Sequence, residues 1–144
     1  SLKNKLGHLA YLLEGMKDLS AIEPCGMKIV HDDITLEGNY IWGAVCNSTS
    51  IGGMIRLNKD LVDYNDGLFE VILIKAPKTL FDLTKIVVSI NTQDYDPDVI
   101  DFFQAGDLIF YPETEIPWTL DGEYAPGNTE IHIKNIHNAL QIIV

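Results

Sequence analysis

The chain has 144 residues, which is enough for one domain with a hydrophobic core of its own. Its hydrophobic content of 47% is normal for a folded domain, and no apolar run approaches the roughly 20 residues of a membrane-spanning helix. The formal net charge of −11 argues against nucleic acid as a partner and against electrostatic attachment to an anionic membrane, so a lipid would have to be met through apolar contact or a partner domain.

Cysteine usage indicates a reducing compartment. Cys25 and Cys46 are the two cysteines, so the chain offers neither a framework of disulfides nor a metal-binding Cys-x-x-Cys motif. No basic, apolar signal peptide opens the sequence. We therefore expect a cytoplasmic protein.

The first predicted element is a helix over Lys5–Asp18, because its apolar residues recur at the spacing of one helical stripe. The segment around Pro24 ends it, and the period then changes to that of strands. Turn-forming residues at Asp32-Asp33 and Glu37-Gly38-Asn39 separate the next short β-rich runs. They predict a meander of hairpins over Met27–His31, Ile34–Leu36 and Tyr40–Asn47.

Asn47–Leu57 is a predicted loop rich in Ser, Thr and Gly. Gly52-Gly53 at its centre would let the backbone approach a ligand such as phosphate, or another segment, closely. Neither Gly-x-x-x-x-Gly-Lys-Ser/Thr nor Gly-x-Gly-x-x-Gly accompanies the pair, and no helix start follows it. A turn between strands is the preferred interpretation, and we expect no ATP site within these residues.

The second half predicts a β-helix-β excursion and then short strands. Phe69–Lys75 is almost wholly apolar, as in a strand covered on both faces, Pro77–Thr84 fits a short helix and Ile86–Ile90 fits a strand. Five further strands are predicted at Val99–Gln104, Leu108–Tyr111, Trp118–Tyr124, Glu130–Lys134 and Leu140–Val144. The sequence therefore predicts one mostly β domain over residues 1–144, an antiparallel β-sandwich with an N-terminal helix and one short inserted helix.

Two carboxylates stand two residues apart in the segment Trp118–Tyr124. If Leu120–Tyr124 is extended, the alternation of a strand sends Asp121 and Glu123 to the same face. Neighbouring acids raise one another's pKa, which suits a general base for a hydroxyl substrate, and such a pair can also bind a divalent cation. Asp-Gly is also the commonest hairpin turn signal, so a solvated turn without chemistry is the competing interpretation, and on these residues alone the favoured one.

A second acidic cluster precedes the strand predicted at Phe69. Asp60, Asp63 and Asp66 crowd a loop whose oxygen ligands suit Mg²⁺ or Ca²⁺. The spacing is not that of an EF-hand, because the turn glycine comes one position early and Ile74 stands where the bidentate Glu belongs. A structural metal held by Asp66 and backbone oxygens, and an ordinary acidic turn, are equally supported.

Taken in order, these pieces resemble the C-terminal domain of the soluble bacterial diacylglycerol kinase and lipid kinase family, which also includes eukaryotic sphingosine kinases. The resemblance runs over almost the whole chain. It rests on Asn47-Ser-Thr-Ser-Ile-Gly52-Gly53-Met54, Asp66-Gly67-Leu68, Phe69-Glu-Val-Ile-Leu-Ile-Lys75, Leu120-Asp121-Gly122-Glu123 and Leu140-Gln-Ile-Ile-Val144. It implies a phosphotransferase domain, mostly a β-sandwich, that supplies the lipid side of a cleft.

Carried over residue by residue, the resemblance also implies site residues. Glu123 would accept the proton of the lipid hydroxyl, with Asp121 beside it, and phosphoryl transfer does need such a carboxylate. The family's structural magnesium site falls on the acidic loop, where Asp66 would bind the ion together with oxygens of Asp63 and Leu68.

The chain departs from the family pattern in three respects. Asp60 stands where a proline is usual and Asn65 where an aspartate is usual, which weakens the metal assignment more than the fold. The family's Gly-Gly-Asp-Gly-Thr nucleotide motif does not occur in these residues, and the sequence opens at Ser1 without Met. We therefore expect an excised C-terminal domain, inactive alone, whose absent N-terminal domain binds ATP.

The expected partners follow from the same resemblance. They are a lipid alcohol such as diacylglycerol, ATP through the absent domain, Mg²⁺ and, transiently, the membrane surface. An exposed strand edge left by excision could pair two copies into a homodimer. The alternative function is a non-catalytic β-sandwich module that binds an apolar or sugar ligand. Glycoside hydrolysis is disfavoured, because Asp121 and Glu123 would lie on one side instead of flanking a scissile bond.

Overall fold

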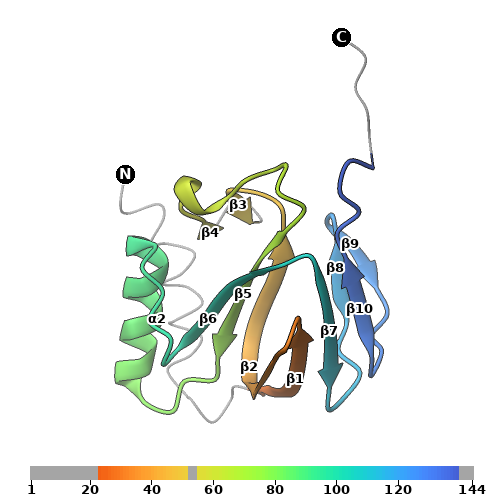
Figure 1. The fold of residues 1–144 in the computed structure, drawn as a ribbon. Helices are drawn as coiled ribbons and strands as arrows, with labels where there is room; N and C mark the ends of the chain where they lie inside the picture. The colour runs from red at the N-terminus through yellow and green to blue at the C-terminus, as the bar shows by residue number, and fades with distance from the viewer. Residues whose placement is uncertain (1–22, 52–54, 140–144) are drawn as a thin grey trace.

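A six-stranded antiparallel sheet in the order β10-β7-β1-β2-β5-β6 forms the body of the protein (Figure 1). The computed structural model describes residues 23–51 and 55–139. The strands of the sheet are β1 (Cys25–His31), β2 (Ile34–Cys46), β5 (Phe69–Lys75), β6 (Ile100–Ala105), β7 (Asp107–Pro112) and β10 (Ile131–Lys134).

Smaller elements are attached to this sheet. Two short hairpins are β3 (Ser50–Ile51) with β4 (Ile55–Arg56), and β8 (Trp118–Leu120) with β9 (Glu123–Ala125). A short 3₁₀ helix, η2 (Lys59–Leu61), precedes β5, and the helix α2 (Leu80–Thr92) lies between β5 and β6. A mostly β fold with antiparallel sheets and an inserted helix is thereby confirmed. The helix predicted over Lys5–Asp18 and the strand predicted over Leu140–Val144 lie outside the described residues.

The turn predicted at Glu37-Gly38-Asn39 is wrong, because β2 runs through it as one strand of 13 residues. This part of β2 pairs with β1 in unbroken register, with Gly38 opposite Met27, and the irregularity comes later, between Tyr40 and Trp42. The ring of Tyr40 lies against Gly38, where an added Cβ would come within 3.0 Å of it. Ladder hydrogen bonds and this packing outweigh the local turn preference.

The strand predicted at Ile86–Ile90 is also wrong, since α2 extends through it to Thr92. The side chain of Thr79 accepts a hydrogen bond from the backbone of Asp82, whose own carboxylate accepts from the Thr79 backbone, so a capping box starts the helix. Leu83 and Ile86 then bury one helical face. Helix capping and amphipathic spacing override the strand preference of the β-branched residues here.

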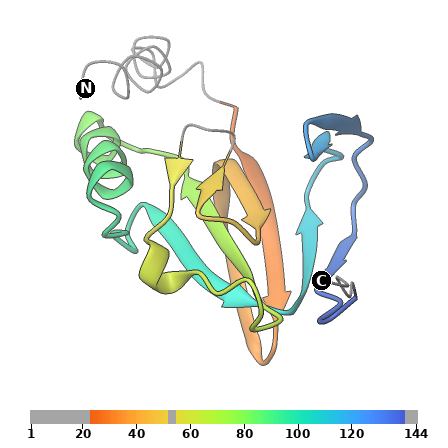
Figure 2. The ribbon, with the colours of Figure 1, turned by 90° about the horizontal axis from the view of Figure 1, so that it is seen from above.

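Both faces of β5 are covered, as its apolar run predicts. Val71 and Leu73 belong to a core on one face, together with Phe110 of β7. Ile72 and Ile74 belong to the core under α2 on the other face. Figure 2 shows α2 and the β8–β9 hairpin on opposite sides of the sheet. The core on one face of the sheet holds the β8–β9 hairpin, and the core on the other face holds α2.

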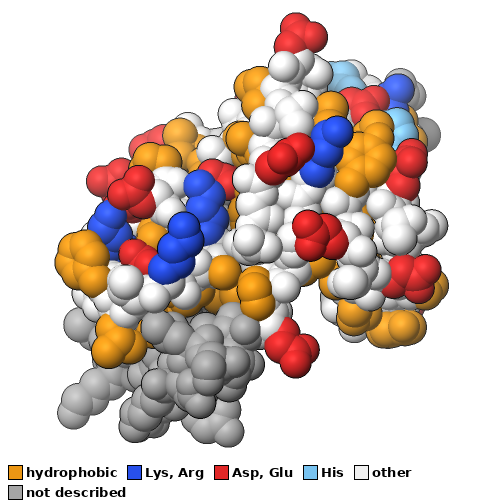
Figure 3. Space-filling model, turned by 90° about the horizontal axis from the view of Figure 1, so that it is seen from below, with side chains coloured by type: hydrophobic (Ala, Val, Ile, Leu, Met, Phe, Trp, Pro, Cys, Tyr) orange, Lys and Arg blue, Asp and Glu red, His pale blue; other side chains and the backbone are white. Residues whose placement is uncertain are grey.

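The surface mixes charges of both signs. Lys75 pairs with Asp101, with an Nζ–Oδ1 distance of 2.9 Å, and Lys85 pairs with Asp96 and Asp98. Figure 3 shows basic and acidic side chains interspersed over the left-hand part of the face seen from below. No continuous basic patch is visible on this face of the described residues.

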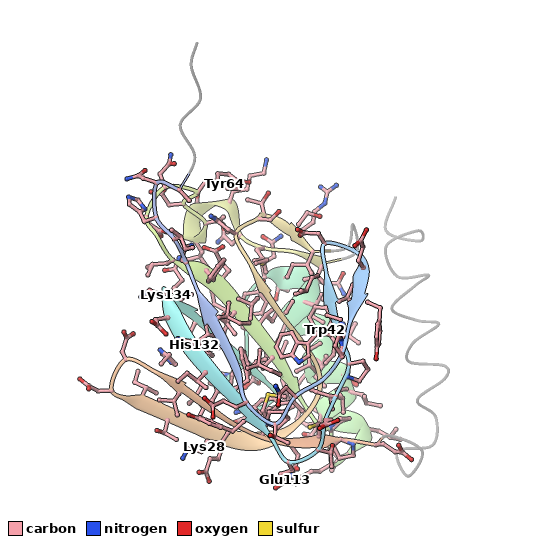
Figure 4. The ribbon with its side chains drawn as sticks, turned by 90° about the vertical axis from the view of Figure 1, so that its right-hand side faces the viewer. Lys28, Trp42, Tyr64, Glu113, His132 and Lys134 are labelled. Carbon is pink, nitrogen blue, oxygen red and sulfur yellow. The ribbon has the colours of Figure 1, made fainter. Side chains whose placement is uncertain are left out.

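One face of the β10-β7-β1 part of the sheet carries polar side chains. Lys28, His132 and Lys134 leave the sheet on the same side (Figure 4), and Lys28 lies over the ring of Tyr111. His132 Nε2 lies 2.5 Å from Asp107 Oδ1.

Among the described residues, no helix is both long enough and apolar enough to cross a membrane.

Candidate functional site

The segment with the paired carboxylates is a hairpin, and not the single strand that would put both on one face. Leu120 pairs with Glu123, which leaves Asp121 and Gly122 as a two-residue turn. Both turn residues have positive φ, 49° and 90°, as a type I′ turn requires. The expectation of an extended Leu120–Tyr124 is therefore wrong. Asp121-Gly122 instead forms the hairpin turn that this dipeptide commonly forms.

Glu123 nonetheless has a defined orientation. Cross-strand partners share a face, so Glu123 lies on the same face of the hairpin as Leu120, and Trp118 two residues earlier shares that face. Trp118 is anchored by an edge-to-face contact with Phe110 of the sheet, with the ring centroids 5.3 Å apart. The buried end of the hairpin is thus fixed by the core, and Glu123 projects from its exposed end.

The free end of this hairpin is open and apolar. Asp121 and Glu123 are exposed, and a Cβ added at Gly122 would meet nothing within 4 Å. Leu120 and Tyr124 are 61% and 77% exposed. Glu123 therefore shares one exposed face of the hairpin with Leu120, and Tyr124 lies on the other face.

The base of the hairpin depends on Gly127. A Cβ at this position would come within 2.4 Å of the carbonyl oxygen of Ile116, on the chain entering β8. We expect Gly127→Ala to displace the hairpin and to lower the free energy of unfolding by about 1–3 kcal/mol, because backbone atoms cannot move aside cheaply.

Chemical denaturation of Gly127→Ala checks this, with Gly43→Ala as the matched control. A Cβ at Gly43 would also be crowded, but by a side-chain atom, Cδ2 of Leu73, at 2.6 Å. Equal destabilisation by the two variants would contradict the role given to the Gly127 backbone contact.

The acidic loop is held by its own carboxylates. Asp63 Oδ1 accepts a hydrogen bond from the Asn65 N–H at 2.9 Å, and Asp66 Oδ1 accepts one from the Leu68 N–H at 2.8 Å. Gly67 follows with a φ of 76°. Asp63 and Asp66 are exposed, which leaves the second oxygen of each carboxylate free to bind a cation.

The loop is also clamped from both sides. A Cβ at Gly106 would come within 2.9 Å of the Gly67 carbonyl oxygen, and a Cβ at Gly67 would come within 3.0 Å of His137 Nδ1. A hollow of about 250 Å³ lies between the loop and the chain after β10, lined among others by Asn47 and Tyr64. The loop conformation is therefore set by packing as well as by its turns.

The acidic loop and the carboxylates of the β8–β9 hairpin do not form one site. Figure 1 shows the acidic loop and the β8–β9 turn at the same end of the molecule, and Figure 2 shows them on different sides of that end. Among the described residues, no group of three or more His, Cys, Asp and Glu side chains gathers as metal ligands would. Asp63 and Asp66 could therefore hold a metal only with help from backbone oxygens or water.

Glu70, which was not predicted as a site residue, is a buried carboxylate two residues after Leu68. It is 0% exposed, its Oε1 accepts from Gln104 Nε2 at 3.2 Å, and its Oε2 has no partner among the described residues. Burial raises the pKa of Glu70, and the nearby Asp66 charge adds to the effect. The signal available in the sequence is one acid in the apolar run Phe69–Lys75.

Comparisons with known proteins agree on one family. The diacylglycerol kinase of Bacillus subtilis is 27% identical over 139 residues, which cover 94% of this chain and 46% of that protein. A protein of Alcanivorax borkumensis named "Probable lipid kinase YegS-like" is 32% identical over 144 residues, which cover 98% of this chain and 47% of that protein. The chain is a homologue of the C-terminal part of the diacylglycerol and YegS-like lipid kinases.

The fold of this chain is also found among solved structures. A crystal structure of a diacylglycerol kinase from Bacillus anthracis str. Sterne superposes with a TM-score of 0.56 at 20% identity, covering 92% of this chain and 47% of that one. No family model matches the chain. The chain spans about half the length of the curated relatives it matches.

Proposed function

We propose that this chain is the lipid-side domain of an ATP-dependent kinase that phosphorylates the hydroxyl of diacylglycerol or a related lipid alcohol. The observation that carries the proposal is its similarity, over 94% and 98% of its length, to proteins named diacylglycerol kinase and lipid kinase. A separate N-terminal domain would bind ATP, because these residues contain no nucleotide-binding motif. We accordingly expect the chain alone to be inactive.

Glu123 is the proposed proton acceptor. As the lipid hydroxyl oxygen forms its bond to the γ-phosphorus of ATP, the proton passes to the Glu123 carboxylate and ADP leaves with the electrons of the broken P–O bond. The exposed end of the hairpin supports this role, since a lipid hydroxyl can reach Glu123 without any rearrangement of the core. Asp121 lies beside Glu123, on the adjoining turn.

We further propose that the enzyme works from the cytoplasm at the surface of the membrane. The hydroxyl of a diacylglycerol lies at the boundary between headgroups and acyl chains, so Glu123 has to reach that depth of the membrane surface. Leu120 and Tyr124, exposed on either side of the turn, would supply apolar contact there. Contact of this kind suits a chain of net charge −11, which gains nothing from anionic lipids.

The chemistry of the acidic loop fits the implied structural Mg²⁺. The free carboxylate oxygens of Asp63 and Asp66 and the Leu68 carbonyl are hard ligands, and Mg²⁺ keeps several waters when bound by one or two carboxylates. Bound there, the ion would neutralise the acidic loop.

We predict that Asp66→Asn abolishes stabilisation by Mg²⁺ while leaving the loop fold intact. The Asn side-chain oxygen can still accept the hydrogen bond from the Leu68 N–H, but the charge that binds the ion is gone. The check is the melting temperature of the chain with and without millimolar MgCl₂. Asp60→Asn, on the preceding 3₁₀ helix, is the control and should keep the shift. A wild-type chain whose melting temperature does not respond to Mg²⁺ would contradict the assignment.

Binding of a short-chain diacylglycerol to the chain tests the lipid-side role. On titration with dioctanoylglycerol, we expect NMR chemical-shift changes centred on the β8–β9 hairpin, Leu120 and Tyr124 included. Glycerol and simple sugars are the control ligands. Changes produced by sugars alone would favour the non-catalytic binding module instead.

A further inference from the structure

The outer edge of β6 forms one wall of a groove that the proposed kinase site does not use. The groove has a volume of about 400 Å³ and runs along β6 between the tip of the β1–β2 hairpin on one side and the segment after α2 on the other. Its apolar lining includes Ile34, Leu61, Phe102 and Phe103. Ile34 and Leu61 are 50% and 42% exposed, so apolar surface remains open to a partner.

Beyond Ile100, whose N–H donates to the Asp96 carbonyl at 2.9 Å, the outer edge of β6 has no partner strand among the described residues. β6 is the last strand of the sheet, with β5 on its inner side, and within the described residues no strand pairs with its outer side. Lys75 N–H donates to the Val99 carbonyl at 2.9 Å, which places the bonded positions of this ladder at odd residue numbers. The N–H and C=O groups of Phe102 and Gln104 therefore point outward, away from β5.

A buried polar group faces the same groove. His31, 5% exposed, lines the groove, and its ring stacks on Phe103 with centroids 4.2 Å apart. Its Nδ1 lies 3.5 Å from an Asp32 oxygen but makes no hydrogen bond with the described residues. A buried ring nitrogen without a partner costs free energy, which a ligand with a donor or acceptor would recover.

The rim of the groove is acidic. Asp32 and Asp33 at the hairpin tip and Asp94 after α2 are exposed, whereas Asp101 is neutralised by Lys75. None of the described residues that line the groove is Lys or Arg. The charge of the groove is therefore complementary to that of a partner with basic residues. Pairing with the same edge of a second copy would instead bring two acidic rims together.

We propose that this groove binds an extended, basic and apolar peptide segment of a partner protein, which adds a strand to the outer edge of β6. Such a strand forms hydrogen bonds with the outward N–H and C=O groups of Phe102 and Gln104. Its side chains alternate between the two faces of the sheet and pack on the apolar residues of the groove. An acyl chain would fill the walls but would leave the backbone groups and His31 Nδ1 without partners. The proposal does not depend on the kinase assignment, because the β8–β9 hairpin contributes nothing to the groove.

The test uses the full chain and a fluorescein-labelled pool of eight-residue peptides with Lys at both ends and alternating Thr and apolar residues, the apolar positions varying among Val, Ile, Phe and Tyr. Fluorescence anisotropy should show saturable binding. Ile34→Glu should weaken it at least about tenfold, by placing a charge in the wall. The matched control is Val88→Glu, at an aliphatic residue 52% exposed on α2 and outside the groove, which should bind as the wild type does.

Backbone methylation of the peptides isolates the strand addition. N-methylation at alternate residues removes the donors on one edge of the peptide, so one methylated set should lose binding and the other should keep it. Hydrogen exchange followed by NMR should show slower exchange at the Phe102 and Gln104 amides on binding, with Phe103 unchanged because it already bonds to β5.

Three results of the peptide experiments would overturn the proposal. They are no binding at about 1 mM peptide, equal binding of both methylated sets, and displacement of the peptides by decanoate without any protection of Phe102 or Gln104. Light scattering that shows the chain pairing with itself, with the same two amides protected, would assign the edge to a second copy and would also overturn it.

Discussion

Replacing Glu123 by Gln in the proposed two-domain parent protein is expected to lower kcat for lipid phosphorylation about 10²–10⁴-fold, the usual contribution of a general base. Gln has nearly the same shape but cannot accept the hydroxyl proton. Because Glu123 is exposed, the free energy of unfolding should change by no more than about 0.5 kcal/mol. The measurement is steady-state transfer of phosphate from ATP to diacylglycerol in mixed micelles, together with urea denaturation of each variant.

Two further variants make the result specific. Glu130→Gln removes an exposed carboxylate just before β10, and its activity should match that of the wild type. Asp121→Asn keeps a residue that tolerates positive φ at the turn, so the hairpin should persist and the activity should fall less than in Glu123→Gln. Full activity of Glu123→Gln would remove Glu123 from the mechanism.

Phe110→Ala is expected to have the largest effect on stability, about 3–5 kcal/mol, because it leaves a cavity that the sheet cannot close. Phe110 is 1% exposed and lies opposite Ile29 of β1 and Ile131 of β10, so its ring fills the core where three strands meet. It also holds Trp118 at the buried end of the β8–β9 hairpin. Lipid phosphorylation should therefore fall together with stability.

The matched control is Ile109→Ala, one residue earlier on the opposite, half-exposed face of β7. It should cost clearly less, and it should leave activity unchanged. Urea denaturation gives the free energies, and assays well below the unfolding midpoint separate loss of fold from displacement of the hairpin. An equal loss of free energy of unfolding in the two variants would show that Phe110 is not the central residue of this core.

The strand pattern of this chain can be predicted from its sequence where burial decides it. Phe69–Lys75 is almost wholly apolar because β5 is covered on both faces, and the structure places the strand within those bounds. The preferences of single residues fail where strand pairing or a capped helix competes with them. Glu37-Gly38-Asn39 has turn chemistry but pairs with β1, and Ile86–Ile90 has strand chemistry but continues a capped helix.

The candidate site shows a different limit. Asp121-Gly122 supports both an extended strand and a hairpin, and only the pairing of Leu120 with Glu123 separates them. Glu70 carries no motif, and it is buried beside a hydrogen-bond partner, Gln104, that lies far away in the sequence. The roles of Glu123, Asp121, Asp63, Asp66 and Leu68 remain predictions that rest on the family resemblance.

The most direct measurement is transfer of ³²P from labelled ATP to a series of lipid alcohols, diacylglycerol first, by the complete two-domain protein and by this chain alone, with Mg²⁺ supplied. We expect a phosphorylated lipid from the two-domain protein and none from the chain alone. Absence of transfer to every lipid alcohol by the folded two-domain protein, or turnover by the chain alone, would contradict this expectation.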